Sequence, residues 1–307
     1  MDHPKRKRVT ESDWSLLIPD VSSLKSVVEA ATAVIPRIVF KVKKRDGVYF
    51  ITVDGHDPGY VCCVSARLQV EGMTFTDGVM AGSGNDLSFC LDCKQVLYSI
   101  ESPSCAHVSL RLDGYVVDSK VALRWADPEH PAHDEDNRLP VFVDEDVDEL
   151  EDMEFDFTIH IPLVKLRELL KKAPKARAEH VRMKLLRGDD NGSGSPPSIF
   201  ELSIEGDTMH RQRFGQLLVR EEDNSLSCKP MQDDAGARLL ADEDKYELAF
   251  EGMYPVEKLN AFVRIVPTKY LEARAKNHMP LLLTHKLGAV DDDSHVHFLV
   301  APVHDEA

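Results

Sequence analysis

The feature that most constrains the fold of this chain is a helix pattern that occurs four times along its 307 residues. In each segment, apolar side chains recur at positions i, i+3 and i+4, which places them on one face of a short helix. The four stripes are Leu24/Val27/Val28, Cys93/Val96/Leu97, Leu166/Leu169/Leu170 and Leu259/Phe262/Val263. Their first residues lie 69, 73 and 93 positions apart. This recurrence predicts one repeated structural unit rather than four unrelated helices.

A strand-like run follows each helix after a turn, and more strands fill the intervals between helices. The four runs after the helices are Arg37–Val42, His107–Leu112, His180–Leu186 and Met279–Thr284. Segments rich in β-branched and aromatic residues predict further strands at Val48–Val53, Tyr60–Val64, Tyr115–Val117, Val121–Leu123, Ile199–Ile204, Gln216–Val219 and Val296–Val300. A unit of strand, helix and several antiparallel strands therefore occurs four times. The length suits about two domains, so we expect an α+β fold with two units in each.

The bulk composition excludes several classes of protein. The hydrophobic fraction of 43% is too high for a wholly disordered chain. No apolar run is long enough to span a bilayer, and the N-terminus lacks the apolar segment of a secretory signal. The six cysteines form no evenly spaced framework, which favours a reducing, intracellular location. Lys5–Arg8 fits a nuclear import signal and equally a solvated basic tail.

Charge is strongly segregated along the chain. There are 37 Lys and Arg against 53 Asp and Glu, a net charge of −16, which by itself argues against nucleic-acid binding. However, Leu163–Ala178 holds six basic residues and one acid, whereas Val143–Asp156 holds nine acids and no base. A lysine-rich helix face is most often simply solvated, and a nucleic-acid surface is the alternative.

Motifs for catalysis are missing. Cys90 and Cys93 have the spacing of half a zinc site, but no second half is evident, so we expect them to be small apolar residues that pack the second helix. The sequence contains no nucleophile elbow, phosphate-binding loop or His-Glu-x-x-His motif. We therefore expect no catalytic residue, no metal and no cofactor, and a protein that is not an enzyme.

Several stretches carry a resemblance to a known family by their order and spacing. They are Leu24–Ala31 with Val48–Asp54 and Val61–Leu68, Val96–Leu123, Val143–Leu150 with Ile161–Pro162, Leu259–Phe262 with Met279–Pro280, and Leu299–Pro302. Together they resemble proliferating cell nuclear antigen, the eukaryotic-type DNA sliding clamp. The resemblance implies two similar clamp domains per subunit and a closed ring, usually of three subunits, whose helices line the central hole. The implied divisions are a basic tail at 1–11, domains at 12–140 and 158–307, and an acidic connector at 141–157.

Such a ring encircles duplex DNA and tethers replication and repair enzymes. Linkage is topological, so the helices need only diffuse attraction to phosphates. An acidic exterior around a basic channel would steer DNA toward the hole. The DNA-facing residues implied are Lys25, Lys94, Lys165, Arg167, Lys171, Lys172, Lys258 and Arg264. The chain departs from the family at Ser26, Thr32 and Glu168, where basic residues are expected.

The resemblance also implies two kinds of protein contact. The groove for partner peptides with a Gln anchor would comprise Val53, Leu150, Asp152, Pro280, Leu299, Ala301 and Pro302. Its partners would be DNA polymerase and other tethered enzymes, and a clamp loader would open the ring. Subunits would join by adding one edge strand to another, at Val121–Trp125 and Gln216–Arg220. The contacting side chains would be Val121, Leu123, Leu217 and Val219.

Other functions stay open at this point. The first hypothesis is a homotrimeric processivity factor, located in the nucleus or in a viral replication compartment and without membrane contact. The same fold would suit a subunit of a heterotrimeric checkpoint-type clamp or a viral processivity factor that forms no ring. From other classes, an acidic interaction scaffold without DNA binding and a zinc enzyme built around Cys90 and Cys93 are the alternatives.

Overall fold

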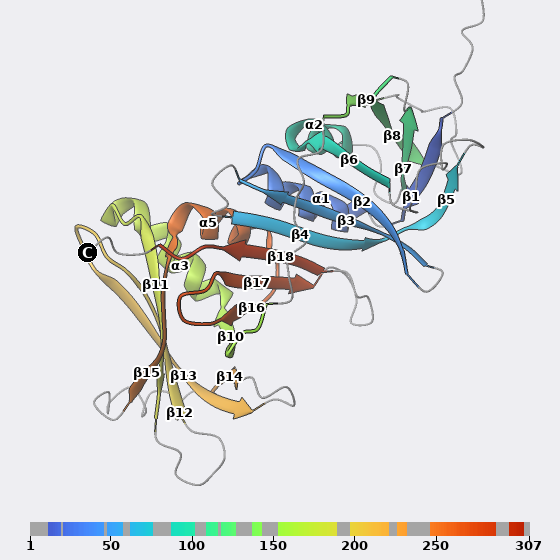
Figure 1. The fold of residues 1–307 in the computed structure, drawn as a ribbon. Coiled ribbons are helices and arrows are strands. Elements are labelled where there is room, and N and C mark those ends of the chain that lie inside the picture. The colour runs from blue at the N-terminus through green and yellow to red at the C-terminus, as the bar shows by residue number, and fades with distance from the viewer. Residues whose placement is uncertain are drawn as a thin grey trace, which may run out of the picture.

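Four helices lie where the apolar stripes predict them in the computed structural model (Figure 1). The structure describes residues 12–19, 21–45, 48–57, 62–75, 87–101, 109–115, 118–126, 137–142, 153–188, 197–220, 226–231, 246–286 and 295–303. The helices are α1 (Val21–Thr32), α2 (Cys93–Ile100), α3 (Leu163–Ala176) and α5 (Val256–Ile265). The prediction of four short helices is confirmed.

The strands divide the chain into two halves with the same order of elements. Half one contains β1 (Trp14–Ile18), β2 (Arg37–Arg45), β3 (Val48–His56), β4 (Cys62–Gln69), β5 (Glu71–Phe75), β6 (Leu87–Asp92), β7 (Ser109–Tyr115), β8 (Lys120–Ala126) and β9 (Asn137–Pro140). Half two contains β10 (Phe157–Pro162), β11 (His180–Arg187), β12 (Pro197–Ile204), β13 (His210–Arg220), β14 (Leu226–Pro230), β15 (Glu247–Pro255), β16 (Tyr270–Ala275), β17 (Leu281–Lys286) and β18 (His295–Val300). Among the described residues, each half runs strand, helix, five strands, helix, three strands. The expected α+β fold of two similar domains is confirmed.

Strand pairing repeats between the halves as well. One sheet has the order β5-β1-β7-β8-β9, and the other has the order β15-β11-β12-β13-β14-β10-β16-β17-β18-β4-β3-β2-β6. The larger sheet crosses from half two to half one where β18 pairs antiparallel with β4 over six residue pairs, from His295↔Arg67 to Val300↔Cys62. We call this pairing the internal junction.

The core lies between the helices and the inner faces of the strands. Leu24, Val27 and Val28 of α1 are buried, as is the matching stripe of α3. Burial of each such side chain contributes about 1.5–3 kcal/mol, which holds these short helices in place better than their propensity could. Phe262 of α5 stacks on Phe298 of β18 with ring centroids 4.7 Å apart. Helices and internal junction therefore share one core.

Strands β10, β14, β15 and β16 of half two were not predicted from the sequence, and β16 is the one whose composition least resembles a strand. The run predicted after the fourth helix is β17, but β16 comes first and has the sequence Tyr-Leu-Glu-Ala-Arg-Ala. Leu271, Ala273 and Ala275 alternate inward as it pairs with β10 and β17. Packing between two strands therefore overrides the helical preference of alanine and glutamate.

No helix among the described residues is long and apolar enough to cross a membrane.

Candidate nucleic-acid interface

The four helices form one layer along the molecule. Contacts run from α2 to α1, from α1 to α5 and from α5 to α3, so helices of both halves lie in one row. Each helix turns its apolar stripe to the core, which leaves its other face outward. The side chains on these outward faces decide what the layer can bind.

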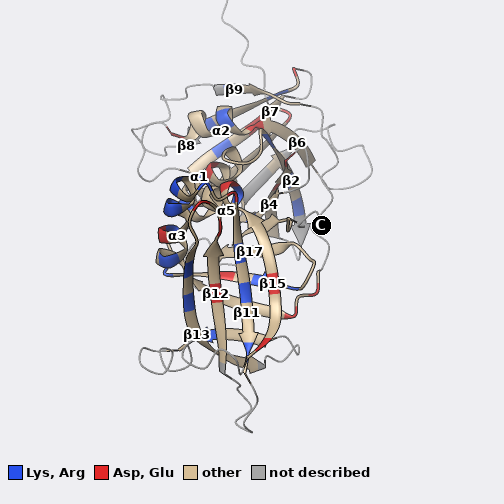
Figure 2. Ribbon diagram, turned by 90° about the vertical axis from the view of Figure 1, so that its left-hand side faces the viewer, with Lys and Arg blue, Asp and Glu red and all other residues tan. Residues whose placement is uncertain are grey.

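Helix α3 carries the strongest charge of the layer (Figure 2). Leu166, Leu169 and Leu170 point into the core, so the helix geometry turns the lysines to solvent. The exposed lysines are Lys165, Lys171, Lys172 and Lys175. Glu168 forms an ion pair with Lys165 at 3.2 Å between Nζ and Oε2. The remaining three lysines give α3 a basic surface suited to phosphates.

Arg167 does not belong to this basic surface, and its assignment to the DNA-facing set is corrected. Its guanidinium is half-buried and donates from Nε and Nη2 to the carbonyl oxygen of Val263, at 3.1 and 2.9 Å. Nη2 also donates to the carbonyl oxygen of Val266. These oxygens lie at the C-terminal end of α5, where helical carbonyls lack partners and the helix dipole is negative. Arg167 therefore fastens α3 to the end of α5.

Lys258 is likewise engaged within the molecule. Its Nζ lies 3.1 Å from Oδ2 of Asp57, and the two side chains are only 20% and 10% exposed. Asp57 follows β3 and also accepts a hydrogen bond from the backbone N–H of Cys62. The pair links α5 of half two to half one, so the assignment of Lys258 to the DNA face is also corrected.

The other basic residues of the layer are sparse. Lys25 of α1 lies 3.8 Å from Glu29, one turn later, which cancels its charge locally. Lys94 of α2 and Arg264 of α5 are exposed. Their role toward DNA stays a prediction, as does that of the α3 lysines.

Part of the expected peptide groove surrounds a surface pocket of about 200 Å³. It is lined by Arg182, Glu251, Gly252, Met253, Tyr254, His278, Met279, Pro302 and Val303. Pro280 follows the lining residue Met279 in the sequence, Ala301 precedes the lining residue Pro302, and both are half-buried. Leu299, on β18, is only 9% exposed. The pocket thus lies where the chain end passes β15, with the N–H of Val303 bonded to the carbonyl of Met253 at 2.8 Å.

Three groove residues are placed differently or fall outside the structure. Val53 is fully buried in the core, so a peptide on the surface does not reach it, and its assignment is corrected. Leu150 and Asp152 lie outside the described residues, as do the tail at 1–11 and most of the connector. Their assignment stays a prediction.

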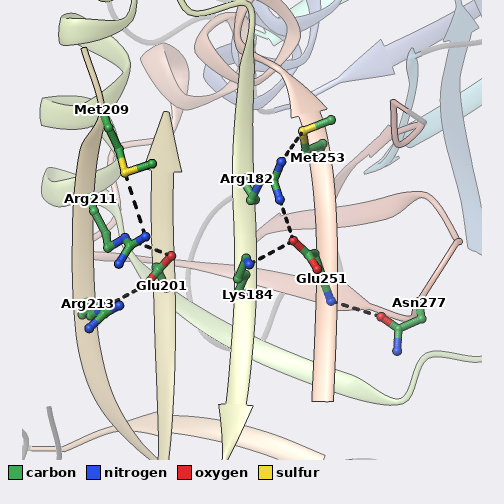
Figure 3. A network of polar contacts seen from close by, with 9 residues as sticks. All are labelled: Arg182, Lys184, Glu201, Met209, Arg211, Arg213, Glu251, Met253 and Asn277. Atoms are coloured by element: carbon green, nitrogen blue, oxygen red, sulfur yellow. Dashed lines mark hydrogen bonds and ion pairs between the residues drawn. The ribbon is translucent and has the colours of Figure 1, made fainter. Parts of the chain in front are cut away.

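A polar network next to the pocket was missed by sequence reasoning (Figure 3). Glu251 of β15 accepts from Arg182 at 3.0 Å and pairs with Lys184 at 3.2 Å, both on β11. The side chain of Asn277 accepts from the N–H of Glu251 and donates to the carbonyl of Ala249, each at 3.1 Å. Asn277 therefore occupies the outer edge of β15 in the manner of a neighbouring strand. The alternation of buried and half-buried residues along β11 indicates that Arg182 and Lys184 lie on the same face of the sheet. Their partner Glu251 could not be predicted, because it lies on β15, which is distant in sequence.

The assembly edges differ from those expected. Strand β8 pairs with β9 from Lys120↔Pro140 to Leu123↔Asn137, so β8 is not an edge, and Val121 and Leu123 are buried in the core. In half two, β14 pairs with β13 over Gln216–Arg220, the part that holds Leu217 and Val219. Both edge assignments are therefore wrong. Within the described residues, several strand edges lack a neighbouring strand: the outer sides of β5, β6, β9 and β15, and the segment 210–214 of β13.

Buried titratable groups do not form a catalytic cluster in the described part of the chain. Burial raises the pKa of the Cys93 thiol to about 12, so it stays protonated and packs as an apolar residue, as expected. No group of three or more His, Cys, Asp or Glu side chains among the described residues is arranged to hold a metal ion. At the internal junction, burial and, to a smaller extent, the charges of neighbouring His295 and Arg274 together lower the pKa of His297 to about 4.

Solved structures of sliding clamps resemble this chain over most of its length. The PCNA2–PCNA3 complex from Sulfolobus tokodaii matches with a TM-score of 0.60 and 13% identity, covering 94% of this chain and 98% of that chain. PCNA from Thermococcus kodakaraensis matches with a TM-score of 0.62 and 16% identity, covering 94% and 100%. No protein-family model matches the sequence, and no curated protein matches it. The two halves, their strand order and these likenesses together show that the chain has the fold of the PCNA sliding clamps.

Proposed function

We propose that this chain is a subunit of a ring-shaped sliding clamp that encircles duplex DNA and tethers replication and repair enzymes. The observation that carries the proposal is the repeated order of elements together with the open edges of β9 and β13. In the internal junction, the last strand of half two joins the fourth strand of half one. The matching pair, the last strand of half one and the fourth of half two, is β9 and β13.

Pairing of β9 in one copy with β13 in the next would repeat the internal junction between copies. The two edges lie at opposite ends of the molecule (Figure 1). Such a contact is head-to-tail, so it uses different surfaces on the two copies and closes into a ring when the rotation between copies allows it. We propose closure with three copies of this chain, which gives a ring of six similar halves.

The helix layer would then face the DNA. Its exposed lysines, above all Lys171, Lys172 and Lys175, would neutralise phosphates without reading bases. Each neutralised phosphate contributes roughly 0.9 to the salt dependence of binding, so a few contacts per copy suffice for a protein that must slide. The protein would act by binding rather than by catalysis.

Partner enzymes would be held outside the ring at the pocket beside Pro302 and Met253. An extended peptide with a Gln anchor would suit it, because the pocket lies along a strand and combines apolar walls with polar groups. A polymerase is the expected partner, with a loader to open the ring, and the nucleus or a viral replication compartment is the proposed location.

The mass of the purified chain in solution tests ring formation. Sedimentation equilibrium should give three times the 34.5 kDa mass of one chain at micromolar concentration. A stable monomer over the whole accessible concentration range would contradict the proposal, and a species of twice the chain mass would contradict the three-copy ring.

A further inference from the structure

Tyr98 of α2 is the most exposed large apolar side chain in the described part of the chain, with 81% of its surface accessible. Helix α2 lies at one end of the helix row, and α3 lies at the other end (Figure 2). The two inner helices, α1 and α5, belong to different halves and contact each other across the internal junction. They therefore show what would cover the two ends of the row.

Helices α2 and α5 are the second helix of each half, and they bury the same positions. Counted from the first residue, the fourth, seventh and eighth residues are buried in both. Tyr98 is the sixth residue of α2, and its counterpart in α5 is Ala261. Ala261 is half-buried, and Lys258, one turn earlier on the same face, pairs with Asp57 of half one. The side of α2 that holds Tyr98 is therefore the side that α5 turns toward the other half.

Helices α1 and α3 are the first helix of each half, and they differ in burial along one flank. When their apolar stripes are aligned, the buried residues Ser23 and Ala30 of α1 correspond to the exposed residues Lys165 and Lys172 of α3. This flank is not the one that contacts α5 within half two, because Arg167 reaches α5 and lies about 200° around the helix from Lys165. In α1 the flank is therefore covered by α5 of the other half, and in α3 it is exposed.

The side chains at the two ends of the row are complementary in shape and chemistry. Lys165 and Lys172 lie seven residues apart, which separates their Cα atoms by about 10 Å along the helix axis. A tyrosine ring fits between their apolar stems, and ammonium groups are attracted to the face of an aromatic ring. The internal junction has small side chains at the same positions, namely Ser23, Ala30 and Ala261.

The open segment of β13, a strand that packs against α3, also needs a neighbour on its inward side. Its outward arginines are already held, since Glu201 lies 3.3 Å from Nε of Arg211 and 2.7 Å from Nε of Arg213 (Figure 3). On the inward side, Phe214 packs against the core but is only half-buried. The Oε1 atom of Gln212 is buried and has no hydrogen-bond partner among the described residues. One neighbour on this side would cover both the strand edge and the flank of α3.

We propose that Tyr98 of one copy packs between Lys165 and Lys172 on α3 of the next copy. The contact rests on the proposed ring and adds the helix pair that accompanies the pairing of β9 with β13. It also selects the head-to-tail arrangement, because two α3 helices would bring lysine against lysine. The ammonium of Lys172 still reaches the hole, since a long lysine keeps its charged end in water while its stem is covered.

Replacing the ring tests the contact at an exposed position, where the fold does not depend on the side chain. Tyr98→Ala should raise the concentration at which copies assemble roughly thirtyfold in sedimentation velocity without DNA, since a buried aromatic contact is lost. Tyr98→Phe should assemble like the parent, because the ring is retained. Tyr98→Lys should weaken assembly roughly a hundredfold or more at low salt, because three ammonium groups then meet. Adding Lys165→Glu and Lys172→Glu to Tyr98→Lys should restore assembly.

Val164→Lys is the matched control, because Val164 is another exposed apolar residue of the helix layer. Its counterpart in α1, Ser22, stays exposed although α5 contacts α1, so Val164 lies outside the proposed contact. The control should assemble like the parent. Assembly of Tyr98→Ala at the parent's concentration, or failure of the two glutamates to restore Tyr98→Lys, would overturn the contact and leave the ring standing. A parent chain that is monomeric throughout would overturn the ring itself.

Discussion

Half one and half two share one order of elements but differ in the charge on equivalent surfaces. Helices α1 and α3 are the first helix of each half, and strands β4 and β13 are the fourth strand. Helix α3 exposes four lysines, whereas α1 has Lys25 paired with Glu29. Strand β13 places two fixed arginines on an open edge, whereas β4 is covered by β18.

The difference shows that the repeated elements determine the fold, whereas the side chains on the outward faces determine what each half can bind. On α1, the hydroxyl of Ser26 donates to the carbonyl of Ser22 at 3.0 Å, and that of Thr32 donates to Val28 at 2.7 Å. These groups are satisfied within their own helix and carry no charge. In the proposed ring, half two therefore supplies most of the attraction to DNA.

Reversing the charge of α3 should have the largest effect on the difference between the halves. We expect Lys171→Glu with Lys172→Glu to lower affinity for duplex DNA roughly a hundredfold at about 0.1 M salt, through loss of two phosphate contacts. The slope of log affinity against log salt should fall by about 1.8. Fluorescence anisotropy over a salt series measures both, and Lys25→Glu on α1 is the matched control. An equal loss from Lys25→Glu would refute the division between halves.

Within α3, Arg167 should affect stability and Lys171 should affect DNA binding. Arg167→Met should leave the carbonyls of Val263 and Val266 unpaired, which costs about 2 kcal/mol of the free energy of unfolding. Calorimetry should show a melting temperature lower by roughly 4 °C. The salt slope of DNA binding should stay unchanged. Lys171→Met, one turn later, should reduce the salt slope of DNA binding and leave the melting temperature unchanged. A reduced salt slope for Arg167→Met would show that Arg167 contacts DNA after all.

The internal junction should respond to acid through His297. Its folded pKa of about 4 lies below the ordinary value of 6.5, so the unfolded chain binds the proton more readily between these values. Stability contributed by the neutral ring is present above pH 6.5 and is lost as pH falls toward 4. We expect about 2 kcal/mol of loss, because part of the ring reaches solvent. Urea unfolding at pH 7 and pH 4.5 should show a smaller difference for His297→Gln than for the parent.

The smallest effect is expected at the end of α3. Arg177 follows the helix with φ of 51°, a left-handed conformation that favours glycine. Arg177→Gly should raise the free energy of unfolding by about 0.5 kcal/mol, since the exposed ion pair with Asp207 contributes little. Chemical denaturation measures this change, and a loss of stability would show that the Asp207 contact matters more than the backbone.

Sequence reasoning succeeded where local periodicity decides the structure. The stripes of α1, α2, α3 and α5 follow from helix geometry alone. It failed for Arg167, because Arg167 and Lys171 lie four residues apart on one helix and only the neighbouring α5 distinguishes them. The edges β8 and β13 were misjudged for the same reason, since a sequence indicates strands but not which strand covers them.

Retention on DNA tests most directly whether the chain encircles its substrate. Duplex DNA tethered by one end to a bead admits a ring at its free end, which a bulky protein can then cap. The ring account predicts that the chain survives a high-salt wash on capped DNA and is lost from uncapped DNA. Equal loss from both would contradict encirclement, because binding by charge alone is released by salt whether or not the end is closed.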